Sequence, residues 1–365
     1  MSWSWTLYRY LGLQYLWATA ITLTGFLLIG LSIDLVDLLN HPTSGSPVPS
    51  DALIGMALLK LPSVALRMMP FVVLIGGVFC FVRLSRTHEL VATRAAGVSA
   101  WDFLAPPLAV AVLVGLFAVL IFTPISASML GEFAALEAKY IHGEASQLEV
   151  STNGLWLRQG TQSEQSVIHA LRVTDQGVRL ENVIVFLYGA NDEFKGRIDA
   201  HSAELHPGAW ALHNAWVSDV VTGLPKHHDN YDLPTTLTPA RIQESFASPD
   251  TLSFWDLPGF ISAAQAAGFG ATRYQLYFYT LLALPALFAA MVFMAASFSL
   301  RLARYGGMGR VVLYSVFAGF GVYFFSNLTQ TLGQSSILPV PLAATAPAAA
   351  AILIGMTLVF HQEDG

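Results

Sequence analysis

The chain has 365 residues, of which 54% are hydrophobic and 12% are charged. Because about a quarter of the residues in a typical soluble domain are charged, this composition excludes an ordinary soluble protein and indicates an integral membrane protein. The formal net charge of -6 makes nucleic acid an unexpected partner. The single cysteine, Cys80, lies inside an apolar run, so no intrachain disulfide can form.

The first apolar run covers residues 11–33 and is long enough to cross a bilayer. Arg9 precedes it, and aromatic residues at its entry form the belt typical of a membrane interface. The run is longer than the core of a signal peptide and lacks a small-residue cleavage pattern, so we expect it to remain as a span. The following segment, 40–50, is rich in Pro, Gly and Ser without Lys or Arg, which predicts an outer loop.

The second run covers residues 52–82 and is expected to be interrupted at its two prolines. Lys60 and Arg67 are seven residues apart and therefore share one helix face. At the rise of an α-helix, Arg67 lies about 24 Å and Lys60 about 35 Å from Arg83. Both cations thus belong to the outer half of the span or to its interface. They either snorkel to the interface or face a cavity or ligand, and the residues alone leave both interpretations open.

A short polar segment, residues 83–99, separates the second and third runs. Read as a helix over about 86–96, it places Arg86, Glu89 and Thr93 on one face and apolar residues on the opposite face. A glycine follows as a natural stop, and an acid near the helix start is favoured by the dipole. The pattern is typical either of a helix that shows its charges to a partner or of an ordinary amphipathic helix between two spans.

The third run covers residues 103–128, and helical character continues through Lys139 and Tyr140. From 143 to 268 the hydropathy falls, and short strand-like runs alternate with Gly, Asn, Asp and Pro. Such a region predicts one all-β domain of the sandwich or jelly-roll type. Its histidines lack the spacing of metal ligands, so no metal site is expected.

Residues 249–270 read as a return segment with a short amphipathic helix around 256–267. Three further apolar runs follow, at 273–300, 311–332 and 337–360. Arginines flank the runs on one side of the membrane, whereas the short loops of the other side carry no Lys or Arg; these arginines are Arg9, Arg83, Arg86, Arg94, Arg301, Arg304 and Arg310. The positive-inside rule therefore predicts six spans with both termini in the cytoplasm and the β domain outside.

The predicted organisation has helices 1–3 in residues 1–142, the β domain in 143–268 and helices 4–6 in 269–365. Three motifs, Leu84 to Ser99, Gly154-Leu-Trp156 and Arg273-Tyr-Gln-Leu276, accompany this arrangement. Together they resemble the LptF/LptG permease family, the membrane subunits of the lipopolysaccharide-export ABC transporter of Gram-negative bacteria. The absence of a basic cytoplasmic extension after the last span, together with the second and third of these motifs, makes the chain more similar to LptG than to LptF. The resemblance implies an α-helical membrane protein with six transmembrane helices plus an inserted all-β periplasmic jelly-roll domain.

The resemblance also implies partners and a task. A chain of this family pairs with an LptF-like permease and binds a dimeric LptB-like ATPase and an LptC-like single-span protein. It extracts lipopolysaccharide from the bacterial inner membrane, and its β domain passes the lipid to a periplasmic LptA-like bridge. The cytoplasmic helix of the family contacts the ATPase, which implies coupling roles for Arg86, Glu89, Thr93 and Arg94, with Glu89 as the chief acidic contact.

One departure from the family concerns the outer end of the first span. Family members commonly carry lysine there, where it can meet the phosphates of lipid A, but this chain has Asp34 and Asp37. Two acids repel a phosphate. Either the lipid A differs in charge, or Lys60, Arg67 and Lys139 provide the anion contacts.

The fifth span carries Asn327, Gln330 and Gln334 at helical spacing in its outer half. In the family this helix borders a lateral gate with the first span of the partner permease. Hydrogen bonding between helices of the same subunit is an equally good interpretation.

The sequence contains no nucleotide-binding loop and no metalloprotease or serine-hydrolase motif. We therefore expect a non-catalytic subunit without a cofactor of its own, with ATP and Mg bound by the partner ATPase. The alternatives are a permease of another envelope lipid or lipoprotein extraction system and a non-transporting membrane scaffold that presents a β domain.

Overall fold

The structure is a computed structural model that describes residues 5–40, 50–137, 148–151, 154–160, 165–174, 178–189, 193–219, 224–235, 237, 248–266, 270–302 and 308–363. The chain divides into two compact units. The helical unit comprises Met1–Ile141, Ser253–Trp255 and Gln275–Gly365, and the β unit comprises His142–Leu252 and Asp256–Tyr274.

Among the described residues, six helical spans are long and apolar enough to cross a membrane. The first and second are α1 (Trp5–Asn40) and α2 (Ser50–Arg86), and the third is built from α4 (Ala100–Phe117), the π-helical turn η1 (Ala118–Phe122) and α5 (Thr123–Glu137). The last three are α8 (Thr272–Leu302), α9 (Met308–Gln334) and α10 (Val340–Glu363). The short helix α3 (Glu89–Ala95) connects α2 to α4. The six predicted spans are thereby confirmed.

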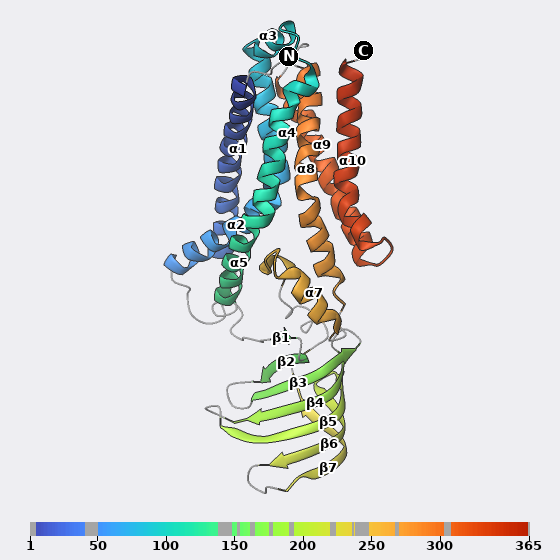
Figure 1. Cartoon of the computed structure of the whole chain (residues 1–365). Coiled ribbons are helices and arrows are strands. Elements are labelled where there is room, and N and C mark those ends of the chain that lie inside the picture. Colours follow the sequence, from blue (N-terminus) through green and yellow to red (C-terminus); the bar gives the residue numbers. More distant parts are fainter. Residues whose placement is uncertain are drawn as a thin grey trace. The chain divides into compact units, whose positions relative to one another are not determined.

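The predicted interruption of the second span is not observed. Pro62 and Pro70 both lie inside α2, which is assigned as one helix of 37 residues. A proline removes one backbone hydrogen bond and bends a helix without necessarily ending it. Figure 1 accordingly shows the first part of α2 bent away from its longer second part.

Helix α2 is the centre of the helical unit, in contact with α1, α5 and α9. At Gly76, α2 crosses α1 so closely that a Cβ at this position would lie 2.7 Å from the Cα of Thr19. Gly115 of α4 approaches α8 in the same way, because a Cβ there would lie 2.6 Å from the Cα of Pro285. Small residues at helix crossings allow the close backbone contact that stabilises spans in lipid.

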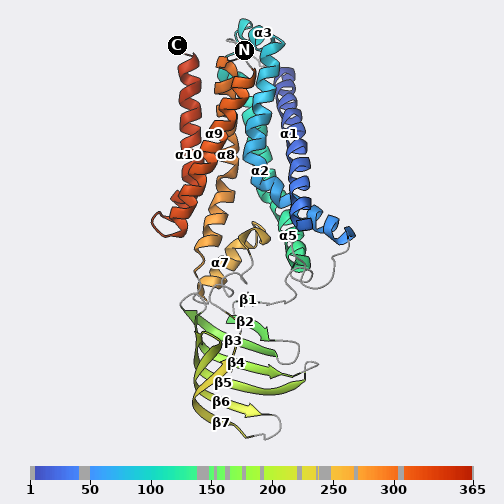
Figure 2. The same ribbon diagram turned by 180° about the vertical axis from the view of Figure 1, so that it is seen from behind.

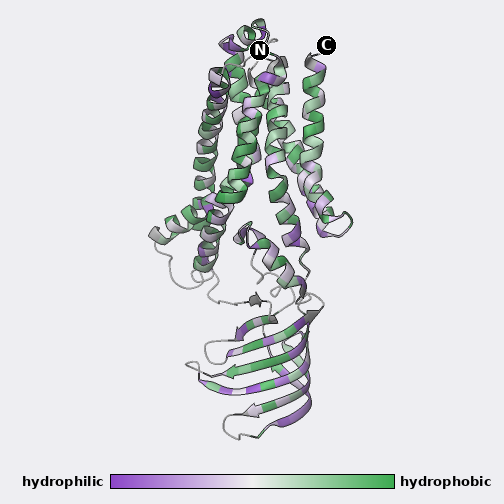
Figure 3. Ribbon diagram, viewed as in Figure 1, coloured by the Kyte–Doolittle hydropathy of each residue, from purple (hydrophilic) through white to green (hydrophobic). Residues whose placement is uncertain are grey.

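One end of the helical unit carries α3, the start of α1 and the end of α10 (Figures 1 and 2). The turn between α9 and α10 lies at the other end. Hydrophobic residues predominate along the spans, whereas hydrophilic ones are frequent around α3 (Figure 3). We call the end with α3 the coupling end and the other the distal end.

The β unit contains one antiparallel sheet whose seven strands follow one another in sequence order. The strands are β1 (Leu148–Ser151), β2 (Gly154–Gly160), β3 (Gln165–Thr174), β4 (Arg179–Tyr188), β5 (Phe194–His206), β6 (Ala209–Asp219) and β7 (Lys226–Pro234). They are followed by a 3-10 turn, η5 (Pro249–Thr251), and by α7 (Leu257–Ala266). The predicted all-β domain between the third and fourth spans is confirmed.

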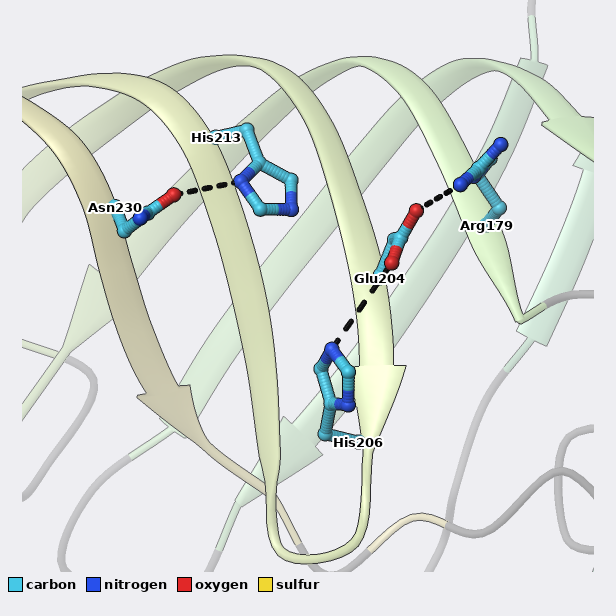
Figure 4. Close-up of polar contacts among 5 residues, drawn as sticks. All are labelled: Arg179, Glu204, His206, His213 and Asn230. Carbon is cyan, nitrogen blue, oxygen red and sulfur yellow. Dashed lines mark hydrogen bonds and ion pairs between the residues drawn. The ribbon is translucent and has the colours of Figure 1, made fainter.

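Two asparagines of the sheet have a left-handed backbone conformation. Asn182 of β4 and Asn214 of β6 both have positive φ angles, 52° and 54°. The pairing register is the same on both sides of each asparagine, and Leu180 and Val183, three residues apart, are both buried. Asparagine tolerates this left-handed conformation better than most residues do. The sheet curls, as Figure 4 shows for β4 to β7.

The curl brings β2 close to the edge strand β7. Gln159 of β2 donates a hydrogen bond from Nε2 to the carbonyl oxygen of Pro234 in β7 at 3.4 Å. Its Oε1 accepts hydrogen bonds from the indole of Trp210 at 3.3 Å and from the hydroxyl of Thr235 at 2.6 Å. Among the described residues, Trp210 is the largest fully buried side chain, and α7 packs against the same core through Phe260. These bonds satisfy polar groups that would otherwise be buried without partners.

Two histidines of the β unit contact polar side chains on the exposed surface. His213 contacts Asn230 at 2.7 Å, and His206 lies 4.0 Å from Glu204, which also pairs with Arg179 (Figure 4). The guanidinium of Arg179 holds the pKa of Glu204 below its ordinary value of 4.5. The His213–Asn230 and Arg179–Glu204 contacts join neighbouring strands, the usual unit of stabilisation in a sheet, whereas Glu204 and His206 both belong to β5.

Candidate functional site

The polar segment between the second and third spans forms α3, a helix of seven residues. No residue of α3 is buried, and Val91 is 60% exposed. Glu89 lies in its first turn and Arg94 in its last, where the helix dipole favours an acid and a base respectively. Because so short a helix is not stable alone, neighbouring parts of the helical unit must hold it.

The helix is shorter than the predicted range of 86–96. Arg86 is the last residue of α2, and the chain turns at Thr87 and His88 before α3 begins. His88 has a φ of 59°, in the left-handed region, and its side chain caps nothing. A left-handed residue redirects the backbone, so Arg86 does not continue the helical face of Glu89.

The end of α3 is fixed to the third span. The amides of Gly97 and Val98 donate hydrogen bonds of 2.9 and 3.2 Å to carbonyls of the last turn. This pairing, with a glycine at a φ of 83°, is the Schellman motif. Ser99 then caps α4, since its Oγ accepts the amide of Asp102 at 3.2 Å. Helix α3 therefore has little freedom to move independently of α4.

A hydrogen bond also joins α3 to α1. The hydroxyl of Tyr10 donates to Glu89 Oε2 at 2.9 Å, and Gln14 Nε2 donates to the hydroxyl oxygen of Tyr10 at 3.3 Å. Beside this bond is a pocket of about 350 Å³ lined by Tyr10, Leu13, Gln14, Trp17, Ile21 and Arg83. The carboxylate predicted to be the chief coupling group is thus held by the first span.

The other predicted coupling residues lie close by. Thr93 is one turn after Glu89 and shares its face, and its hydroxyl donates to the carbonyl of Leu90 at 2.9 Å. Arg94 is half-buried in the last turn, and Arg86 is exposed at the end of α2. The structure therefore gathers all four residues at the coupling end, with Arg86 on a separate helix.

At the distal end, Lys60 has a partner within the chain. Its Nζ lies 2.8 Å from Asp34 Oδ1, so α1 and α2 are joined by an ion pair. The same nitrogen lies 5.7 Å from the ring centre of Phe133 in α5. Asp34 is 9% exposed, and its Oδ2 has no hydrogen-bond partner among the described residues. The acid that departs from the family pattern thus neutralises the nearest lysine.

The remaining predicted lipid contacts differ in their surroundings. Arg67 is exposed on α2, seven residues further toward the coupling end than Lys60, and Lys139 lies outside the described residues. Of the predicted cations in the described part of the chain, Arg67 therefore has the more exposed side chain.

The predicted gate residues lie on α9. Asn327 and Gln334 are exposed, whereas Gln330 donates from Nε2 to the hydroxyl of Ser326 in its own helix at 3.2 Å. Helices α1 and α9 are also the least covered spans, with 11% and 17% of their most apolar windows buried, whereas the other four have 28% to 56%. Both helices therefore present wide apolar faces to lipid or to a partner.

A contact that the sequence did not indicate lies in the middle of the third span. The indole of Trp255 donates to the carbonyl of Leu120, in the π-helical turn, at 3.1 Å. The hydroxyl of Thr123 donates to the carbonyl of Ala118 at 2.9 Å and also contacts that of Val119. Such turns leave carbonyls without their usual α-helical partners. The apolar residues of η1 suit an ordinary α-helix equally well, so no sequence signal could have located it.

Comparison with known proteins identifies the family. The model of the family described as lipopolysaccharide export system permease LptF/LptG matches residues 9–360. The chain belongs to the LptF/LptG family. This membership and the six apolar spans make it a multi-pass permease of the bacterial inner membrane.

Among LptF/LptG proteins, the chain is similar to the lipopolysaccharide export system permease protein LptG of Escherichia coli strain K12 and of strain CFT073. Each is 26% identical to it over 362 residues, which cover 94% of this chain and 95% of the relative. The predicted family and the greater similarity to LptG are confirmed.

Proposed function

We propose that this chain is the permease subunit of an ATP-driven ABC transporter that extracts lipopolysaccharide from the inner membrane. The observation that carries the proposal is α3, an uncovered helix that joins two spans and presents a carboxylate held by a third. A carboxylate on a fixed helix can pair with an arginine of an ATPase. Movement of that ATPase would then be passed to α1, α2 and α4.

The proposed orientation places the coupling end in the cytoplasm. It is supported by the arginines at this end of the spans, which satisfy the positive-inside rule. The β unit, inserted between the third and fourth spans, then belongs in the periplasm. There we propose that it passes lipid to an LptA-like bridge.

The proposed lipid site lies toward the distal end of the spans. Arg67 is exposed there, and Lys60 and Lys139 are further candidates for the phosphates of lipid A. Access for the lipid would run along the uncovered faces of α1 and α9, with Asn327, Gln330 and Gln334 on the gate helix. An LptF-like permease would supply the other half of the cavity, and an LptC-like single-span protein would join the complex.

ATP and Mg are assigned to a separate, dimeric LptB-like ATPase, because the sequence of this chain has no nucleotide-binding loop. The permease contributes movement and a lipid path and no chemical step.

Purification of the complex from native membranes tests the proposal. We expect the chain to retain a Walker-motif ATPase and lipopolysaccharide, both detectable by mass spectrometry. Glu89→Arg should abolish ATPase retention while leaving the amount of chain in the membrane unchanged. A complex that retains the ATPase and another lipid or a lipoprotein would favour a different extraction system. A chain that retains no ATPase would favour a scaffold, and normal ATPase retention by Glu89→Arg would refute the coupling role.

A further inference from the structure

Tyr10 and Glu89 are 79 residues apart in the sequence and are joined by one hydrogen bond. The bond connects α1, the least covered span, to α3, the helix proposed to contact the ATPase. The backbone connects α3 only to α2 and α4. The side chain of Tyr10 therefore provides a link to α1 that the covalent chain does not.

The direction of the hydrogen bonds fixes the hydroxyl proton of Tyr10. Gln14 Nε2 donates to the hydroxyl oxygen at 3.3 Å, and the hydroxyl donates its single proton to Glu89 Oε2 at 2.9 Å. Bonds arranged head to tail in this way polarise and strengthen one another. Gln14 is one helical turn after Tyr10, so α1 itself orients the hydroxyl toward α3.

Glu89 retains capacity for a second partner. An ionised carboxylate has about four acceptor positions on its two oxygens, and Tyr10 occupies one of them. Among the described residues, no further hydrogen bond or ion pair to Glu89 is found. The carboxylate is therefore oriented by one neighbour and open to another, which suits a group that must meet an incoming cation.

We propose that Tyr10 is a positioning residue that orients Glu89 for the cationic partner and carries the movement of α3 to α1. The inference rests on the proposed function, in which Glu89 meets the ATPase and α1 forms part of the lipid gate. Loss of the hydroxyl should leave the spans folded, because the aromatic ring and its apolar contacts remain. It should weaken ATPase binding and reduce the lipid released per ATP hydrolysed.

A double-mutant cycle on the full complex in proteoliposomes tests the proposal. The four proteins are the unchanged chain, Tyr10→Phe, Glu89→Gln and the combination of both. For each, the dissociation constant of the ATPase and the lipopolysaccharide released per ATP are measured. We expect Tyr10→Phe to weaken ATPase binding by about fivefold, the effect of losing one hydrogen bond to a charged group at a partly exposed site. In the Glu89→Gln background, Tyr10→Phe should have no further effect on binding.

Two outcomes would overturn the proposal. In one, Glu89→Gln weakens ATPase binding but Tyr10→Phe binds the ATPase as well as the unchanged chain does. Glu89 would then still be a coupling residue, but Tyr10 would not be its positioning residue. In the other, Tyr10→Phe has the same effect in both backgrounds, so that it acts on the fold rather than through Glu89. An unaltered Glu89→Gln protein would instead refute the proposed coupling role itself.

Tyr314→Phe provides the matched control. Tyr314 is an exposed tyrosine of α9, 48% accessible, six residues after the start of that helix. Its loss of a hydroxyl near the coupling end should leave ATPase binding unchanged. A second variant, Gln14→Leu, removes the donor behind Tyr10 and should weaken binding by less than Tyr10→Phe does.

Discussion

Asp34 of α1 and Lys60 of α2 form an ion pair of 2.8 Å at the distal end of the spans. The two side chains are 12% and 29% exposed respectively, so both charges are partly removed from water. An unpaired carboxylate of Asp34 at this end of the first span would repel a lipid phosphate. Paired with Lys60, it instead joins two spans and leaves little net charge at this position.

Breaking this pair should destabilise the helical unit. Lys60→Met leaves the carboxylate of Asp34 buried without its partner, and we expect a loss of about 1–3 kcal/mol. Heat denaturation of the purified complex measures this loss as a lower midpoint. The exchanged variant Asp34→Lys with Lys60→Asp should recover most of it. An unchanged midpoint for Lys60→Met would show that the pair contributes nothing to stability.

Arg67 should matter more than Asp34 for lipid contact. Arg67 is exposed, whereas Asp34 is buried against Lys60. Arg67→Glu replaces an accessible attraction for phosphate by repulsion, so photo-crosslinking of lipopolysaccharide near this site should fall about tenfold. Asp34→Lys should reduce crosslinking less. The opposite order would remove Arg67 from the proposed lipid site.

Gln159 should stabilise the curled sheet. Gln159→Leu leaves the buried indole of Trp210 without its acceptor, which costs about 1–3 kcal/mol. Limited proteolysis of the full chain should then cut the β unit faster, while the spans stay protected. Gln165→Leu is the control, because Gln165 bonds to Arg158 at an exposed site. Equal proteolysis rates for the two variants would mean that closure of the sheet does not depend on Gln159.

Trp255 should hold the π-helical turn of the third span. Trp255→Phe keeps an aromatic ring but removes the donor to the carbonyl of Leu120. Loss of one neutral hydrogen bond corresponds to about 1 kcal/mol, so local opening should be about fivefold more frequent. The rate of amide hydrogen exchange in a peptide that covers residues 115–125 measures this local opening. Exchange equal to that of the unchanged chain would show that the bond has no role in the turn.

The Arg179–Glu204 pair should make the β unit sensitive to acid. Because Arg179 lowers the pKa of Glu204 below 4.5, the unfolded chain binds the proton more readily. The stabilisation is therefore fully present above pH 4.5 and is lost as the pH falls through the lower folded value. As the pH falls over this range, the melting temperature of the β unit should decrease in the unchanged chain. It should decrease less in Glu204→Gln. Parallel melting curves would contradict the role of the pair.

Local sequence patterns were sufficient for the spans and the β domain. Apolar runs such as 11–33 predict membrane-spanning helices because a span must be apolar over the thickness of the bilayer. Alternation of apolar and polar residues along a strand indicates which face of the sheet is buried. Helix limits were less well predicted, as with Pro62 and Pro70. A proline only weakens one turn, and packing against neighbouring spans decides whether the helix continues.

The sequence by itself determined that this chain spans a membrane six times, carries a β domain after the third span and offers Glu89 on a polar segment. Only the tertiary structure decided that Tyr10 holds Glu89, that Asp34 neutralises Lys60 and that Gln159 reaches Pro234 across the curled sheet. Each pair is separated by 26 to 79 residues. Such contacts depend on how each helix is rotated and how far the sheet bends, and these are set by the packing of the whole unit.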